Sequence, residues 1–443
     1  MLTSQTKLND YIIVGAGFTG LALAFDLSRR GYKVVVLEAE NEIGGLAGSF
    51  DVGGQKLEKF YHHWFNNDKE VFQIIHDVGL EGKIRLRSTN TSIYVANKFF
   101  KLSSPIDLLK FKALSWSGRI RLGLLSLRAR YQSSWEDLES ITASDWLKKL
   151  GGGEVYKVVW EPLLRGKFGD AADDISAVWI WNKLKLRGGS RGKKGQEQLA
   201  YFEGGFSKLA DELKNCIEKN SGQVLVNSKV SDVVVENEKV AGVIVDGTCY
   251  KAGHVILTTP LPIIANLMEP HCSKEYIQSL RKIRYLANIC IVLELNKSLS
   301  SSYWLNVNEP SFPFVAIIEH TNFEDASFYG GRHIVYLSKY LPEDDRLFLM
   351  EDRDVLEYCE RHLRQMFPEF NSNWVSKFHV WRAINSQPII EKNYSSLAPD
   401  SITPIKNLFV NTMAQIYPED RGTNYAIREG RKMADFLTKS SNK

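Results

Sequence analysis

The first 40 residues pass from an apolar run through a glycine-rich turn to a helical pattern and then to a second apolar run. The run from Tyr11 to Val14 predicts a short buried strand. Gly15, Gly17 and Gly20 follow it directly and open the helical pattern. The residues from Lys33 to Leu37 predict the next strand. The N-terminal segment therefore reads as strand, helix, strand.

The remaining pattern divides the chain into blocks. Leucine and isoleucine recur every three or four residues through one long stretch, which predicts helices and almost no strands. Short apolar runs separated by polar turns then predict a meander, and a second group of strands with one helix predicts another sheet. The chain closes with a strand and a helix. These segments are 105–181 (helical), 223–257 (meander), 284–382 (second sheet, with a helix at 352–366), 407–411 (strand) and 425–437 (helix).

The three early glycines indicate a dinucleotide site. Glycines let the backbone turn sharply and approach a pyrophosphate, and the helix N-terminus that follows favours an anion. Glu38 stands 21 residues after Gly17 and ends the second strand, where its carboxylate can accept hydrogen bonds from an adenosine ribose. The same carboxylate would repel a ribose phosphate, so the pattern disfavours NADP. NAD and FAD both fit these residues.

Composition mainly excludes functions. The 443 residues suffice for two to three domains, and the net charge of +4 gives no reason to expect nucleic acid as a partner. The five cysteines are scattered without a C-x-x-C pair, which fits a reducing cytoplasm and no metal site. No secretory signal precedes the first strand, and no apolar run approaches the ~20 residues that span a bilayer. We therefore expect a cytoplasmic protein.

Several motifs together resemble a family of FAD-binding proteins that includes monoamine oxidases, protoporphyrinogen oxidases, phytoene desaturases and UDP-galactopyranose mutases. The resemblance covers nearly the whole chain and implies FAD as the cofactor. It rests on the three early glycines, Glu38, the pair Gly44-Gly45, the segment Glu203 to Leu209, the segment Val230-Ser-Asp-Val, the segment Thr258-Thr-Pro260 and the segment from Arg421-Gly422 to Gly430.

The fold class that follows is α/β. We expect a discontinuous Rossmann-like FAD-binding domain, an inserted helical region and a second, sheet-containing substrate domain. The boundaries are 1–95, 200–280 and 396–443 for the FAD-binding domain, 96–199 for the helical insertion and 281–395 for the substrate domain with its mixed sheet.

The resemblance also implies roles for single residues. In the family, the first glycines and the acid hold the ADP part, the glycine pair lies against the flavin, and the C-terminal segment meets its pyrimidine side. Leu46 stands where the oxidases usually carry an arginine, which leaves one family contact without a donor. The expected cofactor-binding residues are Gly15, Gly17, Phe18, Thr19, Gly20, Glu38, Ala39, Gly44, Gly45, Leu46, Val230, Thr258, Arg421 and Gly422.

His63 is the main candidate for chemistry. His63 followed by Phe65 is similar to the mutase pattern in which a histidine and a phenylalanine lie beside the flavin. A histidine there can donate or accept a hydrogen bond near neutral pH, whereas packing in a loop is the alternative. Arg421 and Tyr425 fall where the mutases supply arginine and tyrosine to the substrate phosphates. The expected catalytic residues are therefore His63, Arg421 and Tyr425.

Two basic clusters leave three readings open. The cluster at 110–130 lies in a leucine-rich helical region and could rest on an anionic membrane, which would make the protein peripheral at the inner membrane face. Either cluster could instead hold the diphosphate of a nucleotide sugar or polyprenyl carrier, or be a solvated face. The second cluster, predicted to lie in a Gly-rich loop, comprises Lys183, Lys185, Arg187, Arg191, Lys193 and Lys194.

Two functions follow from these observations. The first is an FAD-dependent oxidoreductase of the oxidase, dehydrogenase or desaturase type that transfers hydride between a small or lipid-like substrate and flavin N5. It would lack its own NAD(P)H domain, because Gly151-Gly-Gly153 has no strand before it. The alternative is a sugar-nucleotide isomerase like UDP-galactopyranose mutase that uses reduced flavin. The expected partner is a small-molecule, lipid-linked or nucleotide-linked substrate.

Overall fold

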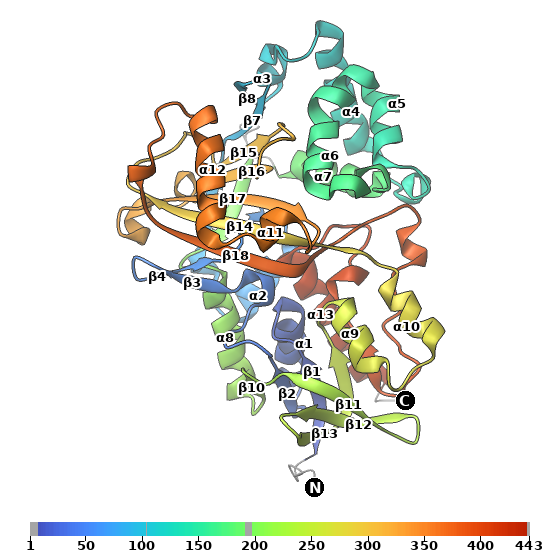
Figure 1. The fold of residues 1–443 in the computed structure, drawn as a ribbon. Coiled ribbons are helices and arrows are strands. Elements are labelled where there is room, and N and C mark those ends of the chain that lie inside the picture. The colour runs from blue at the N-terminus through green and yellow to red at the C-terminus, as the bar shows by residue number, and fades with distance from the viewer. Residues whose placement is uncertain (1–7, 103, 191–196, 441–443) are drawn as a thin grey trace.

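The computed structural model describes residues 8–102, 104–190 and 197–440. Figure 1 shows three parts: a lower part that contains the first and last elements of the chain, a helical block at the upper right, and a second sheet at the upper left. The predicted architecture, an α/β fold with an inserted helical region and a second sheet-containing part, is confirmed.

The lower part is built on a seven-stranded sheet in the order β10-β2-β1-β13-β12-β11, with β19 paired to β13. Strands β10, β2, β1, β13 and β19 are parallel, whereas β11, β12 and the first half of β13 form the predicted antiparallel meander. The strands are β1 (Asn9–Val14), β2 (Val34–Leu37), β10 (Gln223–Leu225), β11 (Val230–Glu236), β12 (Lys239–Val245), β13 (Thr248–Leu257) and β19 (Leu408–Val410).

Apolar side chains cover both faces of this sheet. Ile13 packs with helices α1 (Phe18–Arg29), α8 (Phe206–Lys219) and α13 (Thr423–Ser440), whereas Ile12 packs on the opposite face. Both residues are fully buried, which is the pattern expected for a parallel strand between two covering layers. The last helix lies directly against the first, since a Cβ at Gly430 would stand 2.4 Å from the carbonyl oxygen of Thr19.

The second sheet has the order β18-β14-β17-β16-β15-β7-β8. Ile291 of β14 faces the buried side of helix α12 (Asp352–Met366), and its neighbour Val292 faces the core of the lower part. The sheet therefore separates α12 from the lower part. Its strands are β7 (Thr91–Val95), β8 (Lys98–Lys101), β14 (Tyr285–Leu295), β15 (Trp304–Val307), β16 (Ala316–Glu319), β17 (His333–Leu341) and β18 (Val375–Pro388), and α11 (Arg346–Leu349) precedes α12.

Smaller elements connect these parts. Two strands form a hairpin, and three more form a small sheet. None of the described helices combines the length and the hydropathy that a bilayer span requires. These elements are β3 (Ser49–Val52), β4 (Gln55–Glu58), β5 (Trp64–Phe65), β6 (Ile84–Ser88), β9 (Gln198–Phe202), α2 (Lys69–Asp77), α9 (Leu261–Met268) and α10 (Lys274–Arg281).

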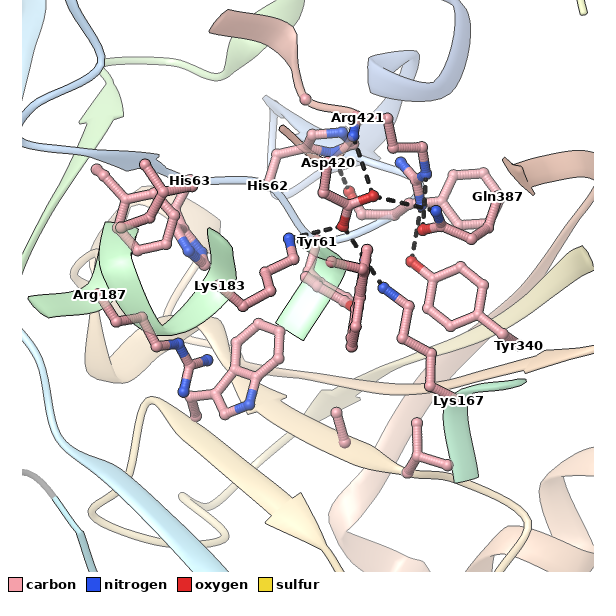
Figure 2. Close-up of a pocket in the computed structure, with 18 of the residues that line it drawn as sticks. Tyr61, His62, His63, Lys167, Lys183, Arg187, Tyr340, Gln387, Asp420 and Arg421 are labelled. Carbon is pink, nitrogen blue, oxygen red and sulfur yellow. Dashed lines mark hydrogen bonds and ion pairs between the residues drawn. The ribbon is translucent and has the colours of Figure 1, made fainter. Parts of the chain in front are cut away.

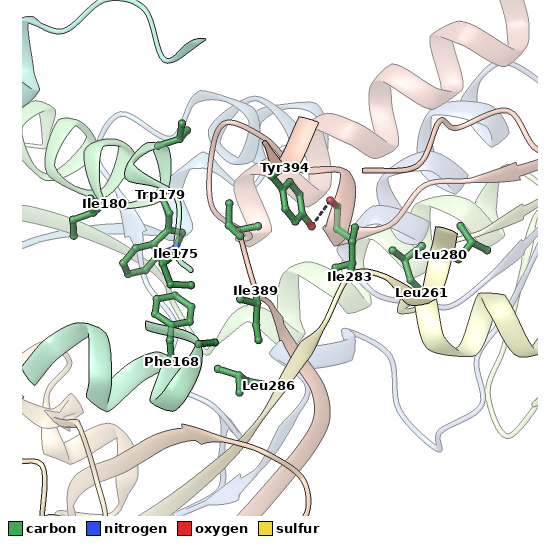
Figure 3. Close-up of a cluster of buried hydrophobic side chains, with 14 of the residues drawn as sticks. Phe168, Ile175, Trp179, Ile180, Leu261, Leu280, Ile283, Leu286, Ile389 and Tyr394 are labelled. Atoms are coloured by element: carbon green, nitrogen blue, oxygen red, sulfur yellow. Dashed lines mark hydrogen bonds between the residues drawn. The ribbon is translucent and has the colours of Figure 1, made fainter. Parts of the chain in front are cut away.

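The helical block is joined to the rest by a continuous apolar core. Figure 3 shows Phe168 and Trp179 of the block beside Leu286 at the start of β14 and Ile389 after β18. All four are buried, so the block is packed against the second sheet and the C-terminal segment. The helices of the block are α3 (Pro105–Lys110), α4 (Trp116–Tyr131), α5 (Ala143–Val155), α6 (Glu161–Phe168) and α7 (Ala177–Gly189).

Two features differ from the sequence-based expectations. Strands β7 and β8 belong to the second sheet, because β7 pairs in parallel with β15, although these residues were assigned to the FAD-binding domain and the helical insertion. Lys183, Lys185 and Arg187 lie in α7, so the predicted Gly-rich loop is wrong here. The apolar residues between these cations continue the helix as far as the glycines that suggested a loop. Residues 191, 193 and 194 lie outside the described residues.

Candidate functional site

The three early glycines serve different structural needs. Gly15 has φ of +106°, and a Cβ there would lie 2.8 Å from Oγ1 of Thr258. A Cβ at Gly20 would lie 2.1 Å from the carbonyl oxygen of Gly15, so the turn and the helix can touch only without side chains. At Gly17, by contrast, φ is −70°, and a Cβ would meet no described atom within 4 Å. Neither the backbone conformation nor the packing within the described chain requires a glycine at this position.

Glu38 and the glycine pair close the same loop from the other side. The carboxylate of Glu38 accepts hydrogen bonds from the backbone N–H of Ala16 at 2.7 Å and of Glu40 at 3.0 Å. The N–H of Gly44 donates to the carbonyl of Ala16 at 2.8 Å. A Cβ at Gly45 would lie 3.3 Å from Cα of Gly17, so the two glycine segments approach each other closely.

These residues fit the ADP part of a dinucleotide. Helix α1 begins after Gly17, which has no side chain to cap the first-turn N–H groups, and the positive end of the helix dipole lies there. A pyrophosphate can accept from such groups. The carboxylate of Glu38 stands at the end of β2, next to this turn, where a ribose hydroxyl could donate to it. The open space at Gly17 is consistent with a ligand that approaches the backbone.

The other predicted cofactor residues take different places. Phe18 and Thr19 are buried in the first turn of α1, and Ala39 is exposed beyond β2. The hydroxyl of Thr258 donates to the carbonyl of Val14 at 2.9 Å, so it stabilises the backbone just before the glycine turn. Val230 begins β11, is buried, and does not line the cavity described below.

A cavity of about 340 Å³ lies beside the segment that follows the glycine pair Gly44-Gly45. Leu46 lines it next to the glycine pair, and His63 lines it from the segment before β5. Arg421, Gly422 and Tyr425 line it from the start of α13. The structure therefore brings the three residues expected to be catalytic to one cavity, together with three of the expected cofactor-binding residues, of which Arg421 was expected in both roles.

The start of α13 holds the His63 segment in place. The indole N–H of Trp64 donates to the hydroxyl of Thr423 at 2.7 Å, and the side chain of Asn424 accepts from the N–H groups of Glu70 and Val71 at the start of α2. Asn424 therefore acts as a cap for α2 from a distant part of the chain.

A buried carboxylate is the centre of the cavity's polar cluster. Asp420 accepts from Lys183 at 2.7 Å, lies 3.7 Å from Lys167, and accepts from the side chain of Gln387 at 3.1 Å (Figure 2). Arg421 turns to other partners: its guanidinium donates to the hydroxyl of Tyr340 at 2.8 Å and to Gln387 at 3.2 Å. Helices α6 and α7, strands β17 and β18 and the α13 segment all contribute to this cluster.

The cluster shifts the charges of its members. Burial alone would raise the pKa of Asp420, but Lys183, Lys167 and Arg421 hold it well below its usual range. Burial lowers the pKa of Lys167 to about 7, although Asp420 opposes that shift. The charge of Lys167 therefore changes near neutral pH.

His63 is held as a neutral imidazole. Burial lowers its pKa to about 3, and Arg187, His62 and Lys183 contribute in the same direction. Its Nδ1 lies 2.9 Å from the hydroxyl of Tyr303. His63 can thus donate or accept a hydrogen bond near neutral pH, and it does so as a neutral group. His62 also lines the cavity, and burial lowers its pKa to about 4.

Sequence reasoning missed most of the polar cluster. Asp420 was adjacent to Arg421 in a motif already singled out, and Lys183 and Arg187 are four residues apart in an apolar stretch. Helical spacing would have placed both cations on one face. No signal in the sequence connected Lys167 or Tyr340 to the site. Over the described parts of the chain, no group of three or more His, Cys, Asp and Glu residues could hold a metal ion.

Comparison with known proteins gives three kinds of match. A family model described as flavin containing amine oxidoreductase matches residues 18–435. The chain is 23% identical over 434 residues to the 15-cis-phytoene desaturase of an Oncidium hybrid cultivar, covering 90% of this chain and 73% of the relative. It is 25% identical over 254 residues to the mitochondrial protoporphyrinogen oxidase of Nicotiana tabacum, covering 50% of each.

A solved structure of reduced UDP-galactopyranose mutase superposes with a TM-score of 0.75 at 14% identity, covering 99% of this chain and 95% of that one. At this identity the similarity concerns the fold alone. The same fold therefore occurs in proteins named for quite different reactions.

Proposed function

The chain belongs to the flavin-containing amine oxidoreductase family, and from this premise we propose that it binds FAD and oxidises or reduces a substrate held in the main cavity. Membership confirms the resemblance drawn from the motifs and makes the protein a flavin-dependent oxidoreductase. The identity of the flavin as FAD is part of the proposal. It is supported by the ADP-type loop around Gly17 and Glu38.

One observation carries the proposal. The cavity is lined by Leu46 and Gly422, which belong to the segments expected to hold the flavin, and also by side chains of the helical block and second sheet. A ring system against the first set of residues would share the cavity with a substrate against the second set. FAD, when bound, supplies the redox chemistry, because its ring can accept or give a hydride.

The chain's own residues supply orientation and hydrogen bonds. Arg421 is fixed by Tyr340 and Gln387, so its guanidinium is already oriented before any ligand arrives. The neutral His63 can donate to or accept from a substrate atom without a change of charge. The apolar walls exclude water from the reacting atoms, which strengthens each of these contacts.

The test starts with the cofactor. We expect the purified protein to carry a flavin that denaturation releases and chromatography identifies as FAD. After anaerobic reduction with dithionite, candidate acceptors such as oxygen or a quinone should reoxidise it. A colourless protein that takes up no FAD would refute the proposal.

A second candidate function is an isomerase that uses reduced flavin, as in the mutases. The specific observation in its favour is that Arg421 and Tyr425, which the mutase pattern assigns to substrate phosphates, both line the cavity with two lysines. The same reduced protein mixed with UDP-galactopyranose distinguishes the two. A ring-isomerised product formed while the flavin stays reduced would support the isomerase, and coupled reoxidation would exclude it.

We also propose that helix α4 contacts a membrane surface. Its buried residues include Leu122 and Leu125, and the opposite face exposes a line of large apolar side chains. At 3.6 residues per turn these fall within an arc of about 80°, and the arginines lie on both sides of it. The exposed side chains are Trp116, Ile120, Leu124, Leu127 and Tyr131, the flanking arginines are Arg119, Arg121, Arg128 and Arg130, and the neighbouring α3 exposes Ile106 and Leu109.

An apolar stripe between basic residues suits the interface of an anionic bilayer. We expect the protein to float with vesicles of phosphatidylcholine and phosphatidylglycerol, and less with phosphatidylcholine alone. The double variant Ile120→Glu/Leu124→Glu should stay unbound. Leu349→Glu is the matched control, since Leu349 is 68% exposed on α11, away from the stripe. Equal flotation of all three proteins would refute the contact.

A further inference from the structure

The cavity holds more positive than negative side chains. Among the described residues that line it, four are basic and two are acidic. Burial raises the pKa of Asp68 to about 6, so one of the two acids is readily neutralised. The basic residues are Lys167, Lys183, Arg187 and Arg421, and the acidic ones are Asp68 and Asp420.

Arg187 is an exposed cation of the cavity lining. It has no hydrogen bond or ion pair to any described residue, and its guanidinium lies 5.9 Å from the ring centre of Trp304. Lys183, one helical turn earlier on α7, has Asp420 as its ion-pair partner and two further N–H bonds to offer. Figure 2 shows Arg187, Lys183 and His63 on the same side of the cavity.

Two tryptophans form part of the cavity wall. Trp160 and Trp179 both line the cavity and are more than nine-tenths buried. Their indole N–H groups have no hydrogen-bond partner in the described protein, but both nitrogen atoms are covered by protein, so the rings contribute apolar surface to the cavity rather than donors.

The rest of this wall is apolar. Leu163 of α6 and Ile180, Leu184 and Leu186 of α7 line the cavity beside the two tryptophans. A ligand that fills the space would therefore need an apolar body as well as a group rich in oxygen. The planar guanidinium of Arg187, lying near an aromatic ring, suits bidentate binding of such a group.

We propose that the substrate carries an anionic carboxylate or phosphate on an apolar body, and that Arg187 and Lys183 bind this group. The inference rests on the proposed function, because it concerns the substrate of the same cavity. It makes Arg187 a specificity-determining residue. Carboxylate and phosphate share the recognised chemistry, and the experiment below separates them.

The test measures binding to the flavin-loaded protein by calorimetry, with small water-soluble probes of similar size. These are 3-phenylpropionate, phenethyl phosphate, 3-phenylpropanol and 3-phenylpropylamine, with UDP as a nucleotide-linked phosphate. We expect the better anion to bind about 10–100-fold more tightly than the alcohol, the range for hydrogen bonds to charged groups. Added salt should reduce this preference. Tightest binding by UDP would assign the phosphate to a nucleotide.

Arg187→Met should remove most of the preference for anions and leave the affinity for the alcohol unchanged. Arg361→Met is the matched control, because Arg361 of α12 also lies over a ring, that of Tyr358, and is not a lining residue. Equal binding of alcohol and anions, or anion binding that survives Arg187→Met, would overturn the inference. Flavin content is measured separately, so a protein without flavin would refute only the proposed function.

Discussion

Replacing Gly17 by alanine tests whether the glycine turn is shaped for a ligand. At this position a Cβ meets no described atom within 4 Å, and φ is −70°, which any residue adopts. Alanine lowers the entropy of the unfolded chain but is a poorer N-cap than glycine, and each effect is about 1 kcal/mol or less. We therefore expect the free energy of unfolding of the flavin-free protein to change by less than about 1 kcal/mol.

The affinity for FAD should respond differently. The added methyl group would occupy space beside the N-terminus of α1 and keep a phosphate from at least one backbone N–H. A hydrogen bond to a charged group contributes about 1.5–3 kcal/mol, so the dissociation constant should rise roughly 10- to 150-fold. Titration of the flavin-free protein with FAD, followed by tryptophan fluorescence, measures this change.

Gly20→Ala is the matched comparison. Its Cβ would lie 2.1 Å from the carbonyl oxygen of Gly15 and 3.2 Å from Oγ1 of Thr258. The turn must move, so stability without FAD should fall by about 1–3 kcal/mol, together with FAD affinity. Thermal unfolding with and without FAD separates the two variants. Wild-type FAD affinity in Gly17→Ala, or a loss of stability as large as in Gly20→Ala, would refute the reasoning.

Three further predictions concern buried polar groups. His63→Ala should lower turnover about 100-fold or more while flavin content stays constant. The pH profile of turnover should keep its shape, because the pKa of His63 is about 3. An altered pH profile with full turnover would contradict the role of His63 as a neutral hydrogen-bonding group. Burial raises the pKa of Glu58 from 4.5 to about 7, so the folded state favours the protonated acid, and the stability of the wild type should fall as the pH rises from about 4.5 to 7 by roughly 2–3 kcal/mol. Glu58→Gln mimics the neutral acid and should flatten this dependence in chemical denaturation; an unchanged slope would contradict the assignment. Asp420→Asn removes the partner of Lys183 and Lys167 and should lower the free energy of unfolding by about 3 kcal/mol at pH 7. The loss should be smaller at pH 9, where Lys167 is neutral. Equal losses at the two pH values would exclude the charge of Lys167 as the cause.

Local patterns accounted for the elements that could be predicted. Apolar periodicity predicted the strand from Tyr11 to Val14, the meander strands within 230–257 and the helix at 352–366, and the structure confirms them. The first predicted meander strand, at 223–225, was assigned wrongly, because β10 pairs in parallel with β2 at the other edge of the sheet. The prediction for residues 183–187 was wrong because it also relied on a local pattern, the glycines that follow. In the structure, Trp179 and Ile180 of α7 pack in the core of the helical block, and the helix continues through this segment. There, tertiary packing outweighed the local signal.

The polar cluster could not be predicted, because its members come from distant parts of the sequence. Lys167 reaches Asp420 from α6, while Tyr340 and Gln387 come from two strands of the second sheet. Their meeting depends on how the helical block packs on that sheet. The periodicity and motifs of a single sequence do not indicate which distant residues come into contact. Short motifs such as Gly15 to Gly20 form their structure from neighbouring residues, so the sequence alone could predict them.

The origin of these side chains separates cofactor binding from substrate choice. The loop around Gly17 and the start of α13 contribute backbone groups and small residues, which suit a constant ligand. Lys183 and Arg187 come from α7, and the apolar side chains beside them come from the same block. Asp420 connects the two sides, since it adjoins Arg421 and pairs with Lys183. An anion bound to the two free N–H groups of Lys183 would share this ammonium group with Asp420, and Lys167 at 3.7 Å would further compensate that carboxylate. Substitutions in α7 should therefore change which substrate is accepted before they change whether the flavin is held.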